Sequence, residues 1–181
     1  SLTTDPDVVT YNQGGTGAQD RTLTSKLQET VSVKDFGAVG DGVTDDTASI
    51  NAALSSGYAS VFFPSGNYLT TGNHEIPTKT RLFGERGTTI IPSGTPTSVF
   101  NITDNDSDQR QGIIIDYFAL NGNCTYFIQI TGGYSYVHTF SNLQLSGGSG
   151  TALIYLNVTS TTRAPSRWDI IGIDARKSGF D

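Results

Sequence analysis

The sequence contains no methionine, one tryptophan, two histidines and a single cysteine, Cys124. One cysteine excludes an intrachain disulfide framework and supplies no set of metal ligands, so we expect no bound metal or cofactor. Charged residues make up only 15% of the chain, and Lys plus Arg number 11 against 17 Asp plus Glu, which gives a net charge of −6. An acidic chain without a Lys/Arg cluster argues against nucleic acid as a partner.

Long apolar runs and a secretory signal are also missing. No run approaches the length needed to span a bilayer, so we expect no membrane insertion. Because the chain starts at Ser1 and has no methionine, we interpret it as a fragment or a processed product whose initiator is gone.

The residues that are abundant favour a turn-rich, all-β protein, since Gly numbers 21 and Thr, Ser and Asn fill much of the rest. From residue 59 onward, apolar runs alternate with glycine turns. Leu120, Leu145 and Ile173 are 25 and 28 residues apart, and Ile130 and Tyr155 are 25 apart. Such spacings are typical of solenoid rungs, and residues 59–181 allow about five of them.

Residues 31–58 are predicted to form a strand and a capping helix. The apolar residues at 31, 33 and 36 predict a short strand, and the glycines at 37, 40 and 42 a turn with positive φ. Asp45 or Thr44 then supplies an N-cap oxygen, and Asp46 places negative charge in the first helical turn. Small and apolar side chains form one stripe of a helix about three turns long: Ala48, Ile50, Ala53 and Leu54.

Two blocks of this region carry a family resemblance. Residues 35–47, Asp-Phe-Gly-Ala-Val-Gly-Asp-Gly-Val-Thr-Asp-Asp-Thr, and 61–68, Val-Phe-Phe-Pro-Ser-Gly-Asn-Tyr, resemble the opening of pectate-lyase-like right-handed parallel β-helices. The resemblance implies an all-β, right-handed parallel β-helix whose amino-terminal end is capped by the helix. Residues 59–181 would then be its first rungs, and an incomplete set.

Residues 1–30 are predicted to lie outside the β-helix. Residues 7–11 suit an extended segment, 13–17 a flexible one, and 22–29 a two-turn helix with Leu23 and Leu27 on one side. So short a helix is marginal alone, and is either a solvated leader or packed on symmetry-related copies. Residues 8–40 resemble the neck of bacteriophage tailspikes, which favours the second interpretation and implies a homotrimer.

The tailspike resemblance implies a function for the whole protein. It would be a virion tail component that joins other tail proteins on its amino-terminal side. It would bind, and often cleave, capsular polysaccharide or lipopolysaccharide O-antigen on the bacterial surface during adsorption. Because tailspike active sites commonly lie on later rungs or between chains, we expect the fragment alone to be inactive. Two alternatives stay open: a secreted, monomeric pectate-lyase-like lyase or hydrolase, and a structural virion adapter without sugar affinity.

Several acidic residues are candidates for catalysis, each with a structural alternative. Asp116 lies in an apolar strand run and projects from a rung face, without a second carboxylate close to it in sequence. Asp169 and Asp174 lie near Arg176 and Lys177, which fits either acid/base chemistry or an exposed ion-pair cluster. For Asp41, Asp45 and Asp46, turn formation and helix capping are expected rather than catalysis.

Aromatic residues are the candidates for sugar binding, because aromatic faces pack on pyranose rings. We take Tyr134, Tyr136 and Trp168 as the candidates, with Tyr117, Tyr126 and Tyr155 as further aromatics, although core or inter-rung stacking is the expected role of most of these six. His74 and His138 are expected at the surface or in turns. Residues 104–108 resemble the start of a calcium loop but lack its glycine and its bidentate acid, so a solvated loop is expected.

Overall fold

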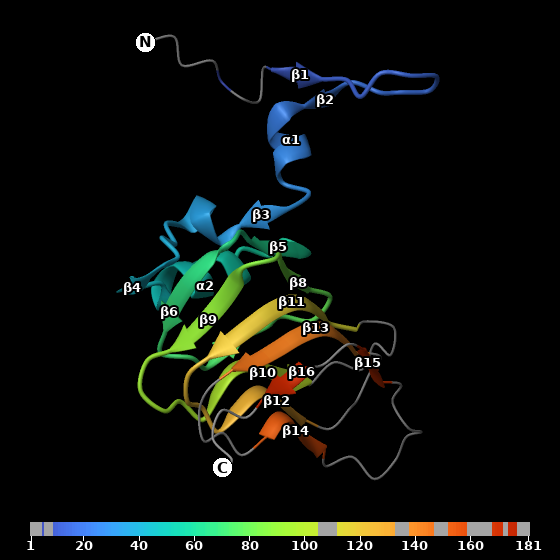
Figure 1. The fold of residues 1–181 in the computed structure, drawn as a ribbon. Helices are drawn as coiled ribbons and strands as arrows, with labels where there is room; N and C mark the ends of the chain where they lie inside the picture. Colours follow the sequence, from blue (N-terminus) through green and yellow to red (C-terminus); the bar gives the residue numbers. More distant parts are fainter. Residues whose placement is uncertain are drawn as a thin grey trace.

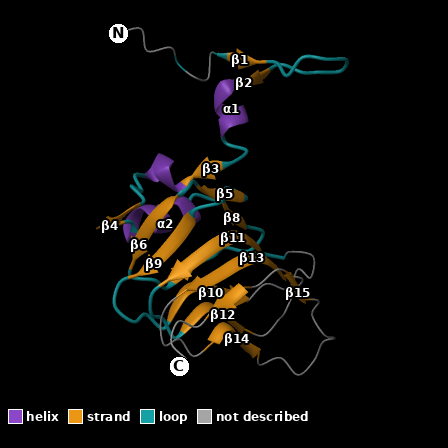
Figure 2. Ribbon diagram, in the orientation of Figure 1, coloured by secondary structure: helices purple, strands orange, loops and turns teal. Residues whose placement is uncertain are grey.

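Most of the described chain coils into a parallel β-helix, and a narrow neck stands off its amino-terminal end (Figure 1). The structure is a computed structural model that describes Asp5 and residues 9–104, 112–132, 138–146, 152–158, 168–171 and 174–176. Figure 2 shows that strands form the body, whereas the helices of the described residues lie in the neck and at the adjoining end. Among these residues, no helix is long and apolar enough to cross a membrane.

The neck is a two-stranded hairpin followed by one short helix. Strands β1 (Thr10–Tyr11) and β2 (Arg21–Thr22) pair antiparallel. Helix α1 (Leu23–Leu27) follows directly, and the Thr22 hydroxyl caps it by accepting a hydrogen bond from the Ser25 amide, 3.1 Å away. The predicted helix over 22–29 is therefore present, although shorter than expected. No residue of α1 is buried.

The cap consists of β3 (Val31–Ser32), the 3-10 helix η1 (Val33–Phe36), β4 (Asp41–Asp45) and α2 (Thr47–Leu54). The predicted strand through residue 36 is wrong beyond Ser32. A capping box ends it, because the Ser32 side chain accepts from the Lys34 amide and Asp35 accepts from the Ser32 amide. The three glycines at 37, 40 and 42 have the predicted positive φ values of 95°, 71° and 80°.

The N-cap position of α2 lies one residue later than predicted, at Asp46 rather than at Asp45 or Thr44. The Asp45 carboxylate still caps the helix, since it accepts from the Thr47 amide at 2.9 Å. Asp46 turns inward instead, and its carboxylate accepts from the amides of Val39 and Gly40 at 2.7 and 3.0 Å. Ile50, Ala53 and Leu54 are buried as predicted, whereas Ala48 is exposed.

Three parallel faces form the body of the solenoid. The first face stacks β3, β5 (Ser60–Phe63), β8 (Arg81–Gly84), the first half of β11 (Ile114–Asn121), the first half of β13 (His138–Ser146) and β15 (Trp168–Ile171). The second stacks β4, β6 (Gly66–Thr70), β9 (Thr88–Pro92), the second halves of β11 and β13, and β16 (Asp174–Arg176). The third stacks β7 (His74–Glu75), β10 (Ser98–Asp104), β12 (Tyr126–Gly132) and β14 (Ala152–Val158).

The register confirms one predicted spacing and corrects two. Leu120 lies opposite Leu145, as the 25-residue spacing predicted. Tyr155 lies opposite Gln129 rather than Ile130. Leu145 lies opposite Ala175, not Ile173. The rungs have unequal lengths, so a single repeat period could not give every partner.

Inward-facing side chains fill the solenoid. On the first face Val61, Leu82, Ile115 and Phe140 align strand by strand, and none of them is exposed. Phe118 and Phe100 lie deeper, with their ring centroids 5.8 Å apart in an edge-to-face arrangement. Further rings extend this stack on both sides: Phe63 contacts Phe118, and Phe127 contacts Phe100. This continuous aromatic core holds successive rungs together.

Candidate functional site

The candidate site lies on the outer surface of the first face, around Asp116. In β11 the side chains of Ile115 and Phe118 point into the core, so Asp116 points outward. The register places Asp116 between Phe83 of β8 and Ser141 of β13. Asp116 therefore lies on the outer side of its rung, as predicted, whereas its catalytic role stays a prediction.

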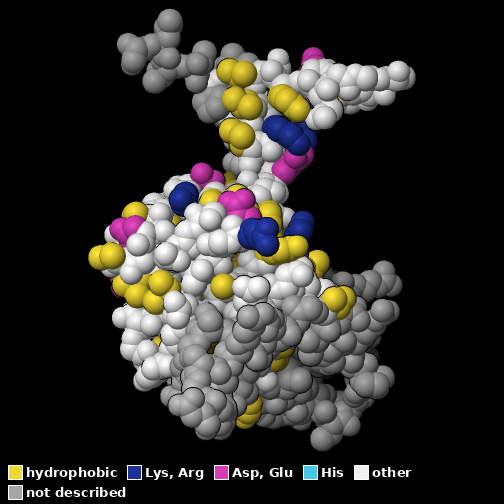
Figure 3. All heavy atoms as spheres, in the orientation of Figure 1, with side chains coloured by type: hydrophobic (Ala, Val, Ile, Leu, Met, Phe, Trp, Pro, Cys, Tyr) yellow, Lys and Arg dark blue, Asp and Glu magenta, His cyan; other side chains and the backbone are white. Residues whose placement is uncertain are grey.

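Neighbouring strands surround Asp116 with apolar and charged side chains. Phe83 stacks on Phe62 of β5 with 5.1 Å between ring centroids, and the Arg81 guanidinium lies 4.5 Å from the centre of the Phe83 ring. We define the Asp116 face as six outward residues of β5, β8 and β11: Phe62, Arg81, Phe83, Ile114, Asp116 and Tyr117. Figure 3 shows Lys or Arg side chains next to hydrophobic ones over β5 and β8.

Two donors on β13 fix the Asp116 carboxylate. The Ser141 hydroxyl and the Asn142 side-chain amide both donate to Oδ1, at 2.7 and 2.9 Å. Among the described residues, no hydrogen bond reaches Oδ2 and no second carboxylate joins this network. The arrangement can therefore accept hydrogen bonds from a ligand, but the pair of carboxylates that most glycosidases use is not present here.

The corner between the first and second faces lies next to Asp116. Tyr117 turns the chain with a φ of 60°, and Asn142 makes the same corner one rung later with a φ of 51°. Beneath Tyr117, a Cβ atom on Gly84 would lie 2.3 Å from the Tyr117 carbonyl oxygen, so only glycine fits there. The Tyr117 side chain itself is 49% exposed.

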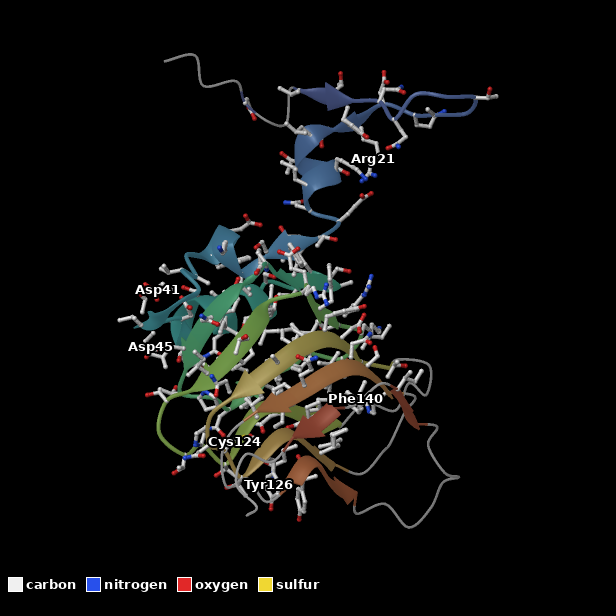
Figure 4. All side chains as sticks on the ribbon, in the orientation of Figure 1. Arg21, Asp41, Asp45, Cys124, Tyr126 and Phe140 are labelled. Carbon is white, nitrogen blue, oxygen red and sulfur yellow. The ribbon has the colours of Figure 1, made fainter. Side chains whose placement is uncertain are left out.

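The acidic turn at residues 41–46 is structural, as predicted. Asp41 accepts from the amides of Thr44 and Val43 at 2.7 and 2.8 Å, and these bonds lower its pKa. The hydroxyl and amide of Thr47 similarly lower the pKa of Asp45. Figure 4 shows Asp41 and Asp45 together at the edge of the cap, beside β4. Hydrogen bonds within the turn account for these carboxylates without a catalytic role.

Both histidines are buried, so the prediction that they lie at the surface or in turns is wrong. His74 contacts α2 and β6, where Nδ1 lies 2.7 Å from Asn51 Oδ1 and Nε2 meets the Thr70 hydroxyl. His138 Nδ1 accepts from the Ile113 amide at 3.2 Å. Burial lowers the pKa of each ring to about 4, so both are neutral at pH 7.

The described residues provide no metal site, since no three His, Cys, Asp or Glu side chains among them converge. Cys124 is buried, and burial raises the pKa of its thiol to about 11. A thiol with so high a pKa is a poor nucleophile at neutral pH.

The remaining predicted site residues are only partly covered. Trp168 and Asp169 lie in β15 and Asp174 lies in β16, but the structure does not describe their side chains. Tyr134 and Tyr136 lie outside the described residues altogether. Residues 105–108 of the acidic loop also lie outside it. Tyr126 and Tyr155 stack between rungs, with ring centroids 4.4 Å apart, which favours the inter-rung alternative for this pair.

Sequence reasoning missed Phe62, Phe83 and Arg81. All three occupy alternate, outward positions of β5 and β8, and their burial patterns show this alternation. The signal was therefore present within each strand. What the sequence did not supply was the register that puts Phe83 beside Asp116.

Comparison with known proteins accounts for this architecture. The profile of the family described as "Rhamnogalacturonase A/epimerase, pectate lyase-like" matches residues 30–132, more than half of the chain. The chain belongs to this family. The matched residues run from the cap through β12, and so contain the Asp116 face.

Phage proteins and polysaccharide-modifying enzymes both stand among the relatives of this pectate-lyase-like chain. It is 36% identical over 101 residues to the "Pre-neck appendage protein" of Bacillus phage B103, a match that covers 54% of this chain and 12% of that protein. It is 38% identical over 86 residues to "Mannuronan C5-epimerase AlgE5" of Azotobacter vinelandii, covering 45% and 8%. The chain thus spans only about a tenth of the length of these relatives.

Solved structures agree with the solenoid fold. "Geobacillus virus E2 - ORF18" superposes with a TM-score of 0.53 at 26% identity, over 67% of this chain and 28% of that one. Tailspike protein 3 of bacteriophage CBA120 superposes with the same TM-score at 17% identity, over 91% and 38%. The second likeness concerns the fold alone.

Proposed function

We propose that the chain is the neck and the first β-helix rungs of a bacteriophage tail appendage of the tailspike type. The full-length protein would recognise capsular polysaccharide or lipopolysaccharide O-antigen on a host bacterium during adsorption. The observation that carries this proposal is the joint occurrence of the capped β-helix, the neck and phage proteins among the relatives. The two alternatives named above, a secreted enzyme and a structural adapter, provide the contrasting outcomes of the tests.

The neck supports assembly into a homotrimer. Helix α1 has five residues and buries none of them, and Leu27 is 61% exposed. Glu29 pairs with Arg21 and Lys26, and Figure 3 shows a row of hydrophobic side chains on the left of the neck and the charged ones on its right, next to one further hydrophobic group. Exposed ion pairs contribute little, and so short a helix is marginal alone. Apolar contact between copies would supply the missing stabilisation.

The solution mass tests this assembly. We expect light scattering on a sizing column to give three times the chain mass of 19.3 kDa. Leu23→Asp together with Leu27→Asp should yield monomers, because three carboxylates would meet at each of the two positions where apolar side chains pack. Val43→Asp is the matched control, since Val43 is 79% exposed on the β-helix rather than in the neck. A monomeric wild-type chain would contradict assembly through the neck and favour the secreted-enzyme alternative.

Polysaccharide recognition needs a separate test. Fluorescently labelled chain should adhere to some strains in a panel of capsulated and smooth bacteria, and enzymatic removal of the capsule or O-antigen should abolish adhesion. We also propose that this chain does not cleave the glycan, because Asp116 has no carboxylate partner among the described residues. Release of reducing ends by the 181-residue chain would contradict that part. Absence of adhesion to every strain would favour the adapter.

A further inference from the structure

We propose that the Asp116 face is a saccharide-binding strip on which Tyr117 provides the platform for a pyranose ring. This inference rests on the proposed function and assigns it to particular residues. Its occupant would be a polysaccharide chain of low charge density that lies across β8 and β11, with a sugar ring on Tyr117 and its hydroxyls near Asp116.

The backbone of Tyr117 supplies the first argument. Left-handed φ values suit glycine and asparagine, and Asn142 occupies the same corner in the next rung. A bulky aromatic residue with a φ of 60° is an outlier at such a corner. Core packing does not compensate for it, because the Tyr117 side chain is 49% exposed. Strained residues of this kind cluster at ligand sites, where the position of the side chain matters more than the strain.

The second argument is the state of the Asp116 carboxylate. Its Oδ1 accepts from Ser141 and Asn142, which holds the group in one orientation, while Oδ2 receives no hydrogen bond from the described residues. Sugar hydroxyls are donors, and a fixed carboxylate oxygen accepts from them without first losing rotational freedom. Asn142, which donates one of these hydrogen bonds, also forms the corner that follows Tyr117 in the next rung.

The third argument comes from the strand next to β11. The register places Arg81 beside Ile114 and Phe83 beside Asp116, on strands about 4.8 Å apart. Arg81 lies over the Phe83 ring, which fixes the guanidinium and leaves its outer N–H groups available for ring or hydroxyl oxygens. Apolar surface and hydrogen-bonding groups thus alternate over distances similar to the width of one sugar ring.

The charge of the strip selects among possible occupants. It has one cation, Arg81, and one carboxylate, Asp116, so its side chains carry no net charge. A polyphosphate or nucleic acid would require a cluster of cations, which is absent from these six residues. The mixture of aromatic faces, a fixed acceptor and a guanidinium instead matches a hydroxyl-rich ligand with apolar ring faces.

The test uses two substitutions at Tyr117 in the 181-residue chain. The probes are purified capsular polysaccharides and O-antigens from a bacterial panel, with dextran and mannuronan as neutral and acidic polymers of known structure. Binding is measured by glycan array and by saturation-transfer NMR. Tyr117→Asn removes the aromatic ring, so we expect the affinity for the bound glycan to fall about tenfold. Because asparagine tolerates a positive φ, the substitution also relieves backbone strain, and the melting temperature should stay equal or rise. Tyr117→Phe keeps the ring and should keep most of the affinity.

Matched controls separate this inference from the proposed function. Val43→Asn also introduces an asparagine at an exposed position, in β4 away from the Asp116 face, and should leave binding unchanged. If the wild-type chain binds a glycan and Tyr117→Asn binds it equally well, the proposal that the Asp116 face binds saccharide is wrong, and the proposed function stands. If no probe binds at millimolar concentration, the proposal that the Asp116 face binds saccharide is also wrong. The solution mass and cell adhesion, measured on the wild-type chain, then judge the proposed function independently.

Discussion

The imidazole Nδ1 of His74 lies 2.7 Å from the side-chain oxygen of Asn51, and this contact joins the capping helix to the first rung. Because an amide oxygen only accepts, Nδ1 carries the proton, and Nε2 of the neutral ring accepts from the Thr70 hydroxyl. The Thr70 oxygen is in turn 3.2 Å from the Thr47 hydroxyl oxygen at the start of α2. A buried, neutral histidine is therefore part of the junction between cap and solenoid.

We predict that this junction makes stability depend on pH between about 6.5 and 4. The pKa of His74 is about 4 in the folded chain and near 6.5 when unfolded, because burial disfavours the charged ring more than nearby Asp45 favours it. Below pH 6.5 the unfolded chain takes up a proton that the folded chain does not. The free energy of unfolding should fall by about 3 kcal/mol down to pH 4 for this residue alone.

Urea titrations at several pH values measure this loss. His138 contributes in the same direction, because burial also lowers its pKa to about 4. His74→Gln should therefore remove only part of the dependence, and combination with a His138 substitution should remove most of it. A wild-type unfolding free energy that stays constant from pH 7 to pH 5 would contradict the prediction.

Asp46→Ala is predicted to destabilise the cap. Asp46 is 1% exposed, and its carboxylate accepts from the amides of Val39 and Gly40, which would both lose their partner. We expect a loss of about 3 kcal/mol in thermal or urea unfolding. Asp41→Ala is the control, because Asp41 is exposed. This substitution should lower the free energy of unfolding by less than about 1 kcal/mol. Equal effects of the two substitutions would refute the assignment of Asp46 as the buried anchor.

Gly84→Ala is predicted to strain the corner beneath Tyr117. The new Cβ would lie 2.3 Å from the Tyr117 carbonyl oxygen, and backbone on two strands would have to move, at a cost of about 2 kcal/mol or more. Gly94→Ala is the comparison, because its φ is positive but its Cβ would meet open space, so about 1 kcal/mol is expected. Thermal melts of both variants measure whether Gly84→Ala is the more destabilising of the two, as we expect.

Phe100→Ala is predicted to be among the most damaging core substitutions. Its ring is fully buried and contacts Phe118 and Phe127 edge to face, so it joins the second and third faces of the solenoid. We expect a loss of about 3–5 kcal/mol in urea unfolding. Phe62→Ala, at the half-buried outer surface, should cost markedly less. A similar cost for both would mean that the outer stack supports the fold as much as the core does.

The sequence was sufficient for the fold because the cap and the first rung are local. The glycine turn, the helix with Ile50 and Leu54, and the strands from Val61 to Tyr68 each follow from neighbouring residues. The limits of the strand before Phe36 and the start of α2 were not predicted correctly. In both places a side chain, Ser32 or Asp46, makes hydrogen bonds that compete with the simpler pattern.

The candidate site was harder to predict, because it depends on register between rungs. Asp116 could be identified as outward-facing from its own strand. Its neighbours Phe83 and Ser141 are 33 and 25 residues away, and only the aligned strands bring them together. His74 was misjudged for a related reason, since its partners Asn51 and Thr70 come from the preceding helix and strand.

The unequal rungs described above also bear on how such a protein can change its target. Val61 and Leu82 are aligned across 21 residues, and Leu82 and Ile115 across 33, yet both pairs occupy the same column of the same face. Residues inserted between strands therefore leave the alignment of the core intact. Under the proposed function, evolution could vary the connecting segments, and single outward residues such as Tyr117, as the host's surface glycans change, while the inward columns keep the molecule folded.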